Sequence, residues 1–204
     1  MTTLVIDGHP NPDSLCASLA RSYQRGNPGA DLVALRDLDF RPHLDRGLTA
    51  DQPLEPDLER VKGQIEQASH IVVLTPTWWA SVPALLKGFM DRVFLPRWAY
   101  RYRKSPLGLP YGIPQGLLKG RSARVLITSD TPAWMLRLRD DHAAKVLKSS
   151  LLGFCGIKPV KVHRFGAVRW STLEQRKGWL RTAERLGKRD ALRERQPRVS
   201  PGCG

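Results

Sequence analysis

Two adjacent tryptophans are the residues best suited to hold a flat ligand. They stand in the run Thr75-Pro76-Thr77-Trp78-Trp79-Ala80-Ser81-Val82-Pro83, where an apolar segment gives way to an amphipathic one. An indole offers a broad aromatic face, so Trp78 and Trp79 could stack on a planar aromatic molecule or anchor the following segment in the core. The residue types alone favour neither reading.

A second candidate site follows the first apolar run. The loop Gly8–Asp13 leads into Ser14, Leu15, Cys16 and Ala17, which open an amphipathic segment. Free amides at a helix N-terminus bind anions such as phosphate, and His9 could donate to the same group. The alternative is that Ser14 or Asp13 is an ordinary N-cap. Neither a G-x-G-x-x-G nor a P-loop pattern occurs, so neither of those nucleotide sites is indicated.

The elements that must position these residues alternate between strand and helix. Five buried apolar runs predict strands at Thr3–Asp7, Asp31–Leu35, His70–Thr75, Arg124–Ser129 and Val160–Phe165. Continuous apolar runs are typical of strands covered on both faces, which favours an α/β three-layer sandwich with a five-stranded parallel sheet of order 2-1-3-4-5. Ligands bind beyond the carboxyl ends of such strands, so the loops Gly8–Asp13, Pro76–Val82 and Asp130–Trp134 are the places to look.

Amphipathic spacing predicts five helices, at Ser14–Arg25, Pro56–Gln67, Pro83–Phe94, Asp140–Phe154 and Thr172–Gly187. Two connections, Asp37–Pro53 and Leu95–Lys119, are too long for plain turns. After Gly187 the sequence is highly charged and then rich in proline and glycine. We therefore expect one domain over residues 1–187 and a disordered basic tail over residues 188–204.

The tryptophan segment carries a resemblance to a known family. Residues 75–94 are similar to the flavin-binding signature P-x-x-W-[WFY]-x-x-P-A-x-L-K-x-x-x-D/E-R-V-F of the flavodoxin-like NAD(P)H:quinone oxidoreductases. Gly8–Ala17 and the acidic-aromatic-proline segment Asp37–Pro42 also resemble that family, and the similarity covers roughly residues 1–185. It implies a flavodoxin-like fold, FMN as cofactor with FAD as the alternative, NAD(P)H as hydride donor, and a quinone or similar small molecule as acceptor.

The resemblance also implies roles for individual residues. His9 and the helix start at Ser14, Leu15, Cys16 and Ala17 would hold the flavin phosphate, and Thr77, Trp78, Trp79 and Ala80 would hold the isoalloxazine. Thr128, Ser129, Asp130 and Thr131 stand where many relatives read Thr-Thr-Gly-Gly, and Trp134 would face the substrate, with His142 in the same part of the sequence. No catalytic side chain is expected, because the cofactor supplies the chemistry.

Charge and cysteine content bear on the partners. The net charge of +14 is concentrated near the C-terminus and around Arg97–Lys104. Nucleic-acid binding is an alternative function, but no nucleic-acid-binding fingerprint accompanies the charge, and we do not expect it. A flavin-binding ancillary subunit of the same fold is a further alternative.

Three cysteines at unrelated spacings predict no metal site, and the absence of a signal peptide or membrane span predicts a cytoplasmic protein. The aromatic excursion Leu95–Lys119 and the apolar face of the predicted helix Pro83–Phe94 together predict a homodimer.

Overall fold

Five parallel strands form the centre of the molecule. The structure is a computed structural model and describes residues 2–49, 52–104, 112–138 and 141–195. The strands are β1 (Thr2–Asp7), β2 (Asp31–Ala34), β3 (Ala68–Pro76), β6 (Ser122–Thr128) and β7 (Val160–Phe165). Their order in the sheet is β2-β1-β3-β6-β7, and every pairing is parallel. The predicted winding, 2-1-3-4-5 for the five core strands, is confirmed.

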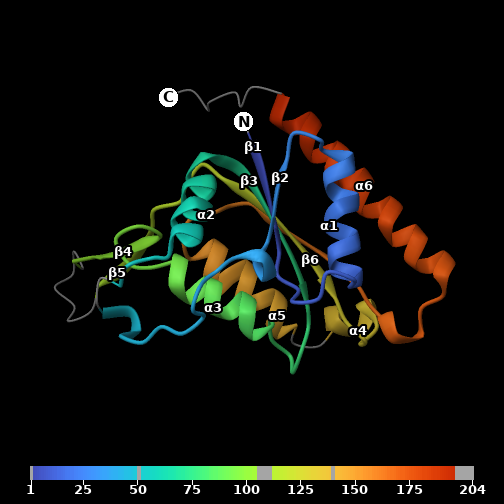
Figure 1. Cartoon of the computed structure of the whole chain (residues 1–204), viewed down its shortest axis with the longest axis horizontal. Coiled ribbons are helices and arrows are strands. Elements are labelled where there is room, and N and C mark those ends of the chain that lie inside the picture. Colours follow the sequence, from blue (N-terminus) through green and yellow to red (C-terminus); the bar gives the residue numbers. More distant parts are fainter. Residues whose placement is uncertain (1, 50–51, 105–111, 139–140, 196–204) are drawn as a thin grey trace.

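Helices cover both faces of this sheet (Figure 1). On one face lie α1 (Leu15–Gly26) and α6 (Leu173–Arg195), and on the other lie α2 (Pro56–Gln67), α3 (Ala84–Val93), α5 (His142–Lys145) and the π-helical segment η3 (Val146–Gly153). Each face has its own apolar core. Tyr23 and Phe165 are fully buried on the α1/α6 side, and Ile65 and Phe89 on the α2/α3 side. No helix within the described ranges is long and apolar enough to cross a membrane.

Short elements occupy the connections. They are the 3-10 turns η1 (Leu35–Asp37), η2 (Gly47–Thr49) and η4 (Val168–Trp170), the helix α4 (Ala133–Leu138), and an antiparallel pair of strands, β4 (Tyr100–Arg103) and β5 (Ile113–Gly116). The long connection Leu95–Lys119 therefore holds a β-hairpin outside the main sheet. The segment predicted as a helix over Asp140–Phe154 is helical from His142 to Gly153, but it is α5 followed by π-helical η3 rather than one α-helix. The loop predicted over Asp130–Trp134 ends earlier than expected, because α4 begins within it at Ala133.

The C-terminal helix also differs from the prediction. It continues through Gly187 to Arg195, so the tail predicted from residue 188 does not begin there, and residues 196–204 lie outside the described ranges. Gly187 is not a helix terminator. A Cβ there would lie 2.2 Å from the Tyr23 carbonyl oxygen, and one at Gly26 would lie 2.0 Å from the Glu184 carbonyl oxygen. Both glycines are needed because the backbones of α1 and α6 nearly touch.

Candidate functional site

Three loops meet at the carboxyl ends of β1, β3 and β6. The Thr77 amide donates to the Thr128 carbonyl over 2.8 Å, and the Gly8 amide donates to the Leu74 carbonyl over 2.9 Å. The Cys16 Sγ lies 3.2 Å from the Thr128 Oγ1. The strand order reverses between β1 and β3, and that reversal is where open α/β sheets bind ligands.

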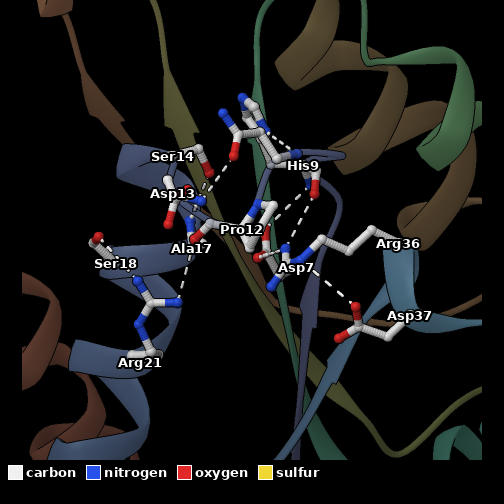
Figure 2. A network of polar contacts seen from close by, with 11 residues as sticks. Asp7, His9, Pro12, Asp13, Ser14, Ala17, Ser18, Arg21, Arg36 and Asp37 are labelled. Carbon is white, nitrogen blue, oxygen red and sulfur yellow. Dashed lines mark hydrogen bonds and ion pairs between the residues drawn. The ribbon is translucent and has the colours of Figure 1, made fainter.

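Hydrogen bonds fix both the shape of the first loop and the tautomer of His9 (Figure 2). The His9 amide donates to Asp7 Oδ1 over 3.1 Å, and the Asn11 amide donates to His9 Nδ1 over 3.0 Å. Because Nδ1 accepts a hydrogen bond, the ring proton of neutral His9 sits on Nε2. Burial lowers the pKa of His9, and the Arg36 guanidinium lowers it further against the opposing effect of Asp7. His9 is therefore a neutral donor through Nε2 near neutral pH.

A guanidinium from the neighbouring strand connection clamps the same loop. Arg36, in η1, donates from Nη1 to Asp7 Oδ2 over 2.6 Å and to the His9 carbonyl over 3.1 Å. Asp7 is buried at the end of β1, with 1% of its side chain exposed. The ion pair compensates a buried negative charge that lies between the sheet and the loop, and it holds the backbone of His9 from both sides (Figure 2).

The N-terminus of α1 has free donors. Ser14 is its N-cap, as one of the two sequence readings predicted, and Ser14 Oγ accepts from the Ala17 amide over 3.1 Å. The Leu15 and Cys16 amides, by contrast, have no acceptor among the described residues. Burial raises the pKa of the Cys16 thiol to about 12, so this side chain stays protonated and turned into the core. Cys16 can serve a ligand only through its main chain.

The two tryptophans form a tight turn beyond β3. Trp78 and Ser81 exchange both backbone hydrogen bonds at 2.9 Å, while Trp79 and Ala80 have φ angles of 50° and 58°. Two consecutive left-handed residues define a turn that normally selects Asn-Gly. Trp79 is 100% exposed, which excludes it as a core anchor. The Trp78 ring stands edge-on to His9 with 5.3 Å between centroids, so the first and second loops are in direct contact.

The left-handed conformation of Trp79 makes a stability prediction. Trp79→Asn is expected to raise the free energy of unfolding by about 0.5–1 kcal/mol, because asparagine tolerates this conformation and the exposed indole buries nothing. Urea unfolding measures the change. Trp78→Asn is the control, since it removes the ring contact with His9 and should not stabilise. A loss of stability in Trp79→Asn would mean that the turn is not strained.

The third loop is tied to the connection after β7. Asp130 Oδ1 accepts from the Arg169 amide over 2.9 Å, and the Thr131 amide donates to Ser129 Oγ over 3.0 Å. The Thr131 carbonyl also accepts from the Ala167 amide over 3.3 Å. The Asp130 carboxylate is therefore engaged with main chain in η4. That Thr128, Ser129, Asp130 and Thr131 contact a cofactor stays a prediction.

Exposed aromatic side chains extend this edge of the molecule. Trp134 in α4 is 61% exposed, and Trp170 in η4 is 70% exposed. The role of Trp134 at the substrate stays a prediction, and His142 is exposed at the start of α5. Sequence reasoning missed Trp170. Its position five residues after the fifth predicted strand was the available signal, because that loop emerges at the same edge of the sheet.

The donors present suit a ligand with a phosphate and a polar-edged ring. The Thr77 Oγ1 is buried and has no hydrogen-bond partner, which is costly unless a ligand supplies one. His9 Nε2 and the amides of Leu15 and Cys16 can all donate to an anion. The Trp78–Ser81 turn lies beside them with its aromatic rings outside the core. These features fit a flavin mononucleotide.

Comparison with known proteins defines the class. Residues 1–188 match a family described by its flavodoxin-like fold, and the chain belongs to that family. An uncharacterized NAD(P)H oxidoreductase of Haemophilus influenzae is 26% identical over 193 residues, covering 90% of this chain and 92% of its own. An FMN-dependent NADH:quinone oxidoreductase of Azotobacter vinelandii is 29% identical over 192 residues, covering 84% and 88%. The crystal structure of Smu.1420 from Streptococcus mutans superposes with a TM-score of 0.79 at 27% identity, covering 93% and 100%.

Proposed function

We propose that this protein is a flavin-dependent oxidoreductase that uses FMN to pass reducing equivalents from NAD(P)H to quinone-like acceptors. The observation that carries the proposal is the meeting of His9, the free amides of α1 and the Trp78–Ser81 turn at the β1/β3 reversal. The names of the relatives in Haemophilus influenzae and Azotobacter vinelandii support the same chemistry.

The protein's own residues would bind and orient the cofactor. His9 Nε2 and the amides of Leu15 and Cys16 would hold the phosphate, and the Thr77 hydroxyl would donate to or accept from the ring system. The Trp78–Ser81 turn would cover the ring edge. When bound, FMN supplies the hydride chemistry between NAD(P)H and the acceptor. Within this scheme no protein side chain has to exchange a proton.

A flavin titration tests the proposal. The protein should quench FMN fluorescence on binding, bleach the bound flavin with NADH or NADPH in the absence of oxygen, and turn over with a quinone. Failure to retain or bind FMN under these conditions would sink the proposal. The same assay with FAD distinguishes the two cofactors.

Thr77→Val gives a sharper result. The variant should weaken FMN binding by roughly threefold to tenfold, the value of one hydrogen bond, and should leave stability unchanged or slightly higher because it removes an orphaned buried hydroxyl. Thr182→Val on α6 is the matched control, since its hydroxyl donates to the Gly178 carbonyl, accepts from Arg185 Nη2 and lies outside the three loops of the candidate site. Equal FMN affinity in Thr77→Val and the control would remove Thr77 from the site.

The proposal includes a cytoplasmic homodimer. The apolar face of α3, on which the sequence argument relied, packs into the protein's own core through Leu86, Phe89 and Val93. The exposed apolar side chains lie elsewhere, with Leu138 in α4 80% exposed and Tyr102 in β4 63% exposed. Light scattering that gave the monomer mass at micromolar concentration would contradict a dimer.

A further inference from the structure

A groove of about 730 Å³ runs along the last strand of the sheet, on the flank that α6 and η3 border. The side chains that give it its character are basic, namely Lys148, Lys161, His163, Arg164, Arg185 and Arg189. Its floor is β7, which pairs with β6 on one side and with no other strand in the part of the chain that the structure describes. The groove is separate from the three loops of the candidate flavin site.

The backbone of β7 offers its own hydrogen bonds to this groove. The Ala123 amide donates to the Pro159 carbonyl over 2.9 Å, and the Ser129 amide donates to the Phe165 carbonyl over 3.0 Å. In a parallel ladder alternate residues face the same neighbour, so these two bonds place the odd-numbered residues of β7 toward β6. The amides and carbonyls of Val160, Val162 and Arg164 therefore face outward. None of them bonds to a described residue.

The positive charge around this edge is not compensated within the described residues. Lys148, Lys161, Arg185 and Arg189 form no ion pair there, because the two nearby acids are already engaged. Asp190 is paired with Arg124, and Asp141 with Arg164. Burial lowers the pKa of Lys161, and Arg193, Arg189 and Arg124 lower it further.

The arginines of α6 repeat at every fourth residue. Arg181, Arg185, Arg189 and Arg193 follow this spacing, which brings like charges together on one helix at a cost to its stability. Arg185 and Arg189 lie on the groove. A row of like charges that destabilises its own helix is more easily understood if something negative binds it.

We propose that this groove binds an acidic, extended segment of another protein, which adds to β7 as an extra strand. Three outward backbone positions suit a polypeptide, because a partner strand supplies alternating donors and acceptors. The half-buried Val160 and Val162 suit small apolar side chains, and the flanking lysines and arginines suit carboxylates.

Other occupants fit this groove less well. A nucleic acid would leave the edge amides unpaired and would find no tryptophan, tyrosine or phenylalanine to stack on among the lining residues. Pairing with β7 of a second copy is disfavoured at this edge, because it would bring the same lysines and arginines against one another.

A fluorescent peptide of alternating glutamate and valine tests the proposal with the full-length protein. Fluorescence anisotropy should show binding at ~0.15 M salt, and Lys161→Glu with Arg185→Glu should weaken it at least about tenfold, as expected for two lost charge contacts. Arg60→Glu with Lys87→Glu is the matched control, because it makes the same charge change on α2 and α3 and should leave binding nearly unchanged.

Backbone recognition is tested separately from charge. Two versions of the same peptide, each N-methylated at one of the two alternate sets of residues, keep their carboxylates but lose the amides along one edge. The version that is methylated on the edge facing β7 should bind about tenfold more weakly. Val162→Pro removes one outward amide, at a position where an edge strand tolerates proline, and should also weaken binding, whereas Val162→Thr should not. If Val162→Pro does not fold, the methylated peptides decide alone. Binding that ignores methylation in both registers, or tighter binding of single-stranded DNA of equal charge, would overturn the proposal.

Discussion

Replacing Asp190 with asparagine is expected to lower the free energy of unfolding by about 3–5 kcal/mol, the usual cost of removing one partner of a buried ion pair. Asp190 is 3% exposed and accepts from Arg124 through both carboxylate oxygens, at 2.6 and 2.8 Å. It also accepts from the Tyr23 hydroxyl over 2.9 Å. The variant would leave the Arg124 guanidinium buried without a countercharge. Urea unfolding followed by circular dichroism measures the loss.

The control for this variant lies on the same helix. Glu184→Gln removes a partly exposed carboxylate that pairs with the exposed Lys188, and it should change stability very little because solvent screens that pair. Equal stability of Asp190→Asn and Glu184→Gln would mean that the buried network does not hold α6 in place. The same reasoning predicts that truncation after Gly187 destabilises the domain.

The ion pair also sets the acid sensitivity of the fold. Burial alone would raise the pKa of Asp190, but the His70 imidazole, whose Nε2 lies 3.4 Å from Oδ2, and the hydrogen bonds from Arg124 outweigh burial and hold the pKa well below its usual range. A depressed folded-state pKa stabilises the protein above the unfolded value of about 3.9, and the contribution is lost as the pH falls below it toward the folded value. Unfolding free energy in the wild type should therefore decline more steeply below about pH 4 than in Asp190→Asn.

The second large effect is expected at Arg36. Arg36→Met should raise the Kd for FMN about tenfold and lower the free energy of unfolding by about 3 kcal/mol. The Asp7 carboxylate would then be buried without its partner, next to the loop that is proposed to receive a phosphate. Its negative charge would oppose the phosphate, and the His9 carbonyl would lose its donor. Isothermal titration and urea unfolding measure the two changes.

A second substitution separates charge from packing. Asp7→Asn combined with Arg36→Met removes both charges, keeps an oxygen for the His9 amide, and should recover most of the stability that Arg36→Met alone loses. Arg60→Met is the control for losing a guanidinium, because its partner Asp57 is on the surface. An Arg36→Met protein that binds FMN as tightly as wild type would show that the clamp does not position the site.

The strands of the sheet could be predicted from the sequence because the signals for them are local. Runs such as Ile71–Leu74 are apolar at every position, which identifies a strand covered on both faces without knowledge of its neighbours. The end of α6 was missed for the opposite reason. The sequence placed Gly187 at the end of the helix and Asp190 in the tail beyond it. Their actual roles depend on the close approach of α1 and on the burial of Arg124, neither of which is visible locally in the sequence.

The candidate site divides in the same way. The positions of His9, Ser14 and Trp78 at strand ends followed from the βα pattern and from resemblance. The clamp by Arg36 could not be predicted from the sequence, because Arg36 and Asp7 are 29 positions apart. In the sequence Asp7 is only the last residue of a predicted strand, and nothing there links it to Arg36. The left-handed conformation of Trp79 could not be predicted either, since the sequence at that turn lacks the Asn-Gly pair that normally indicates such a turn.

The network around Asp190 also bears on when the domain becomes stable during its synthesis. Arg124 lies in β6 and His70 lies near the start of β3, yet their shared partner is 66 residues beyond Arg124 along the chain. Domains form as their sequence leaves the ribosome, N-terminal parts first. A nascent chain with all five strands complete would still hold a guanidinium in its sheet with no countercharge, so the domain reaches its final stability only when the last turns of α6 emerge and dock on α1.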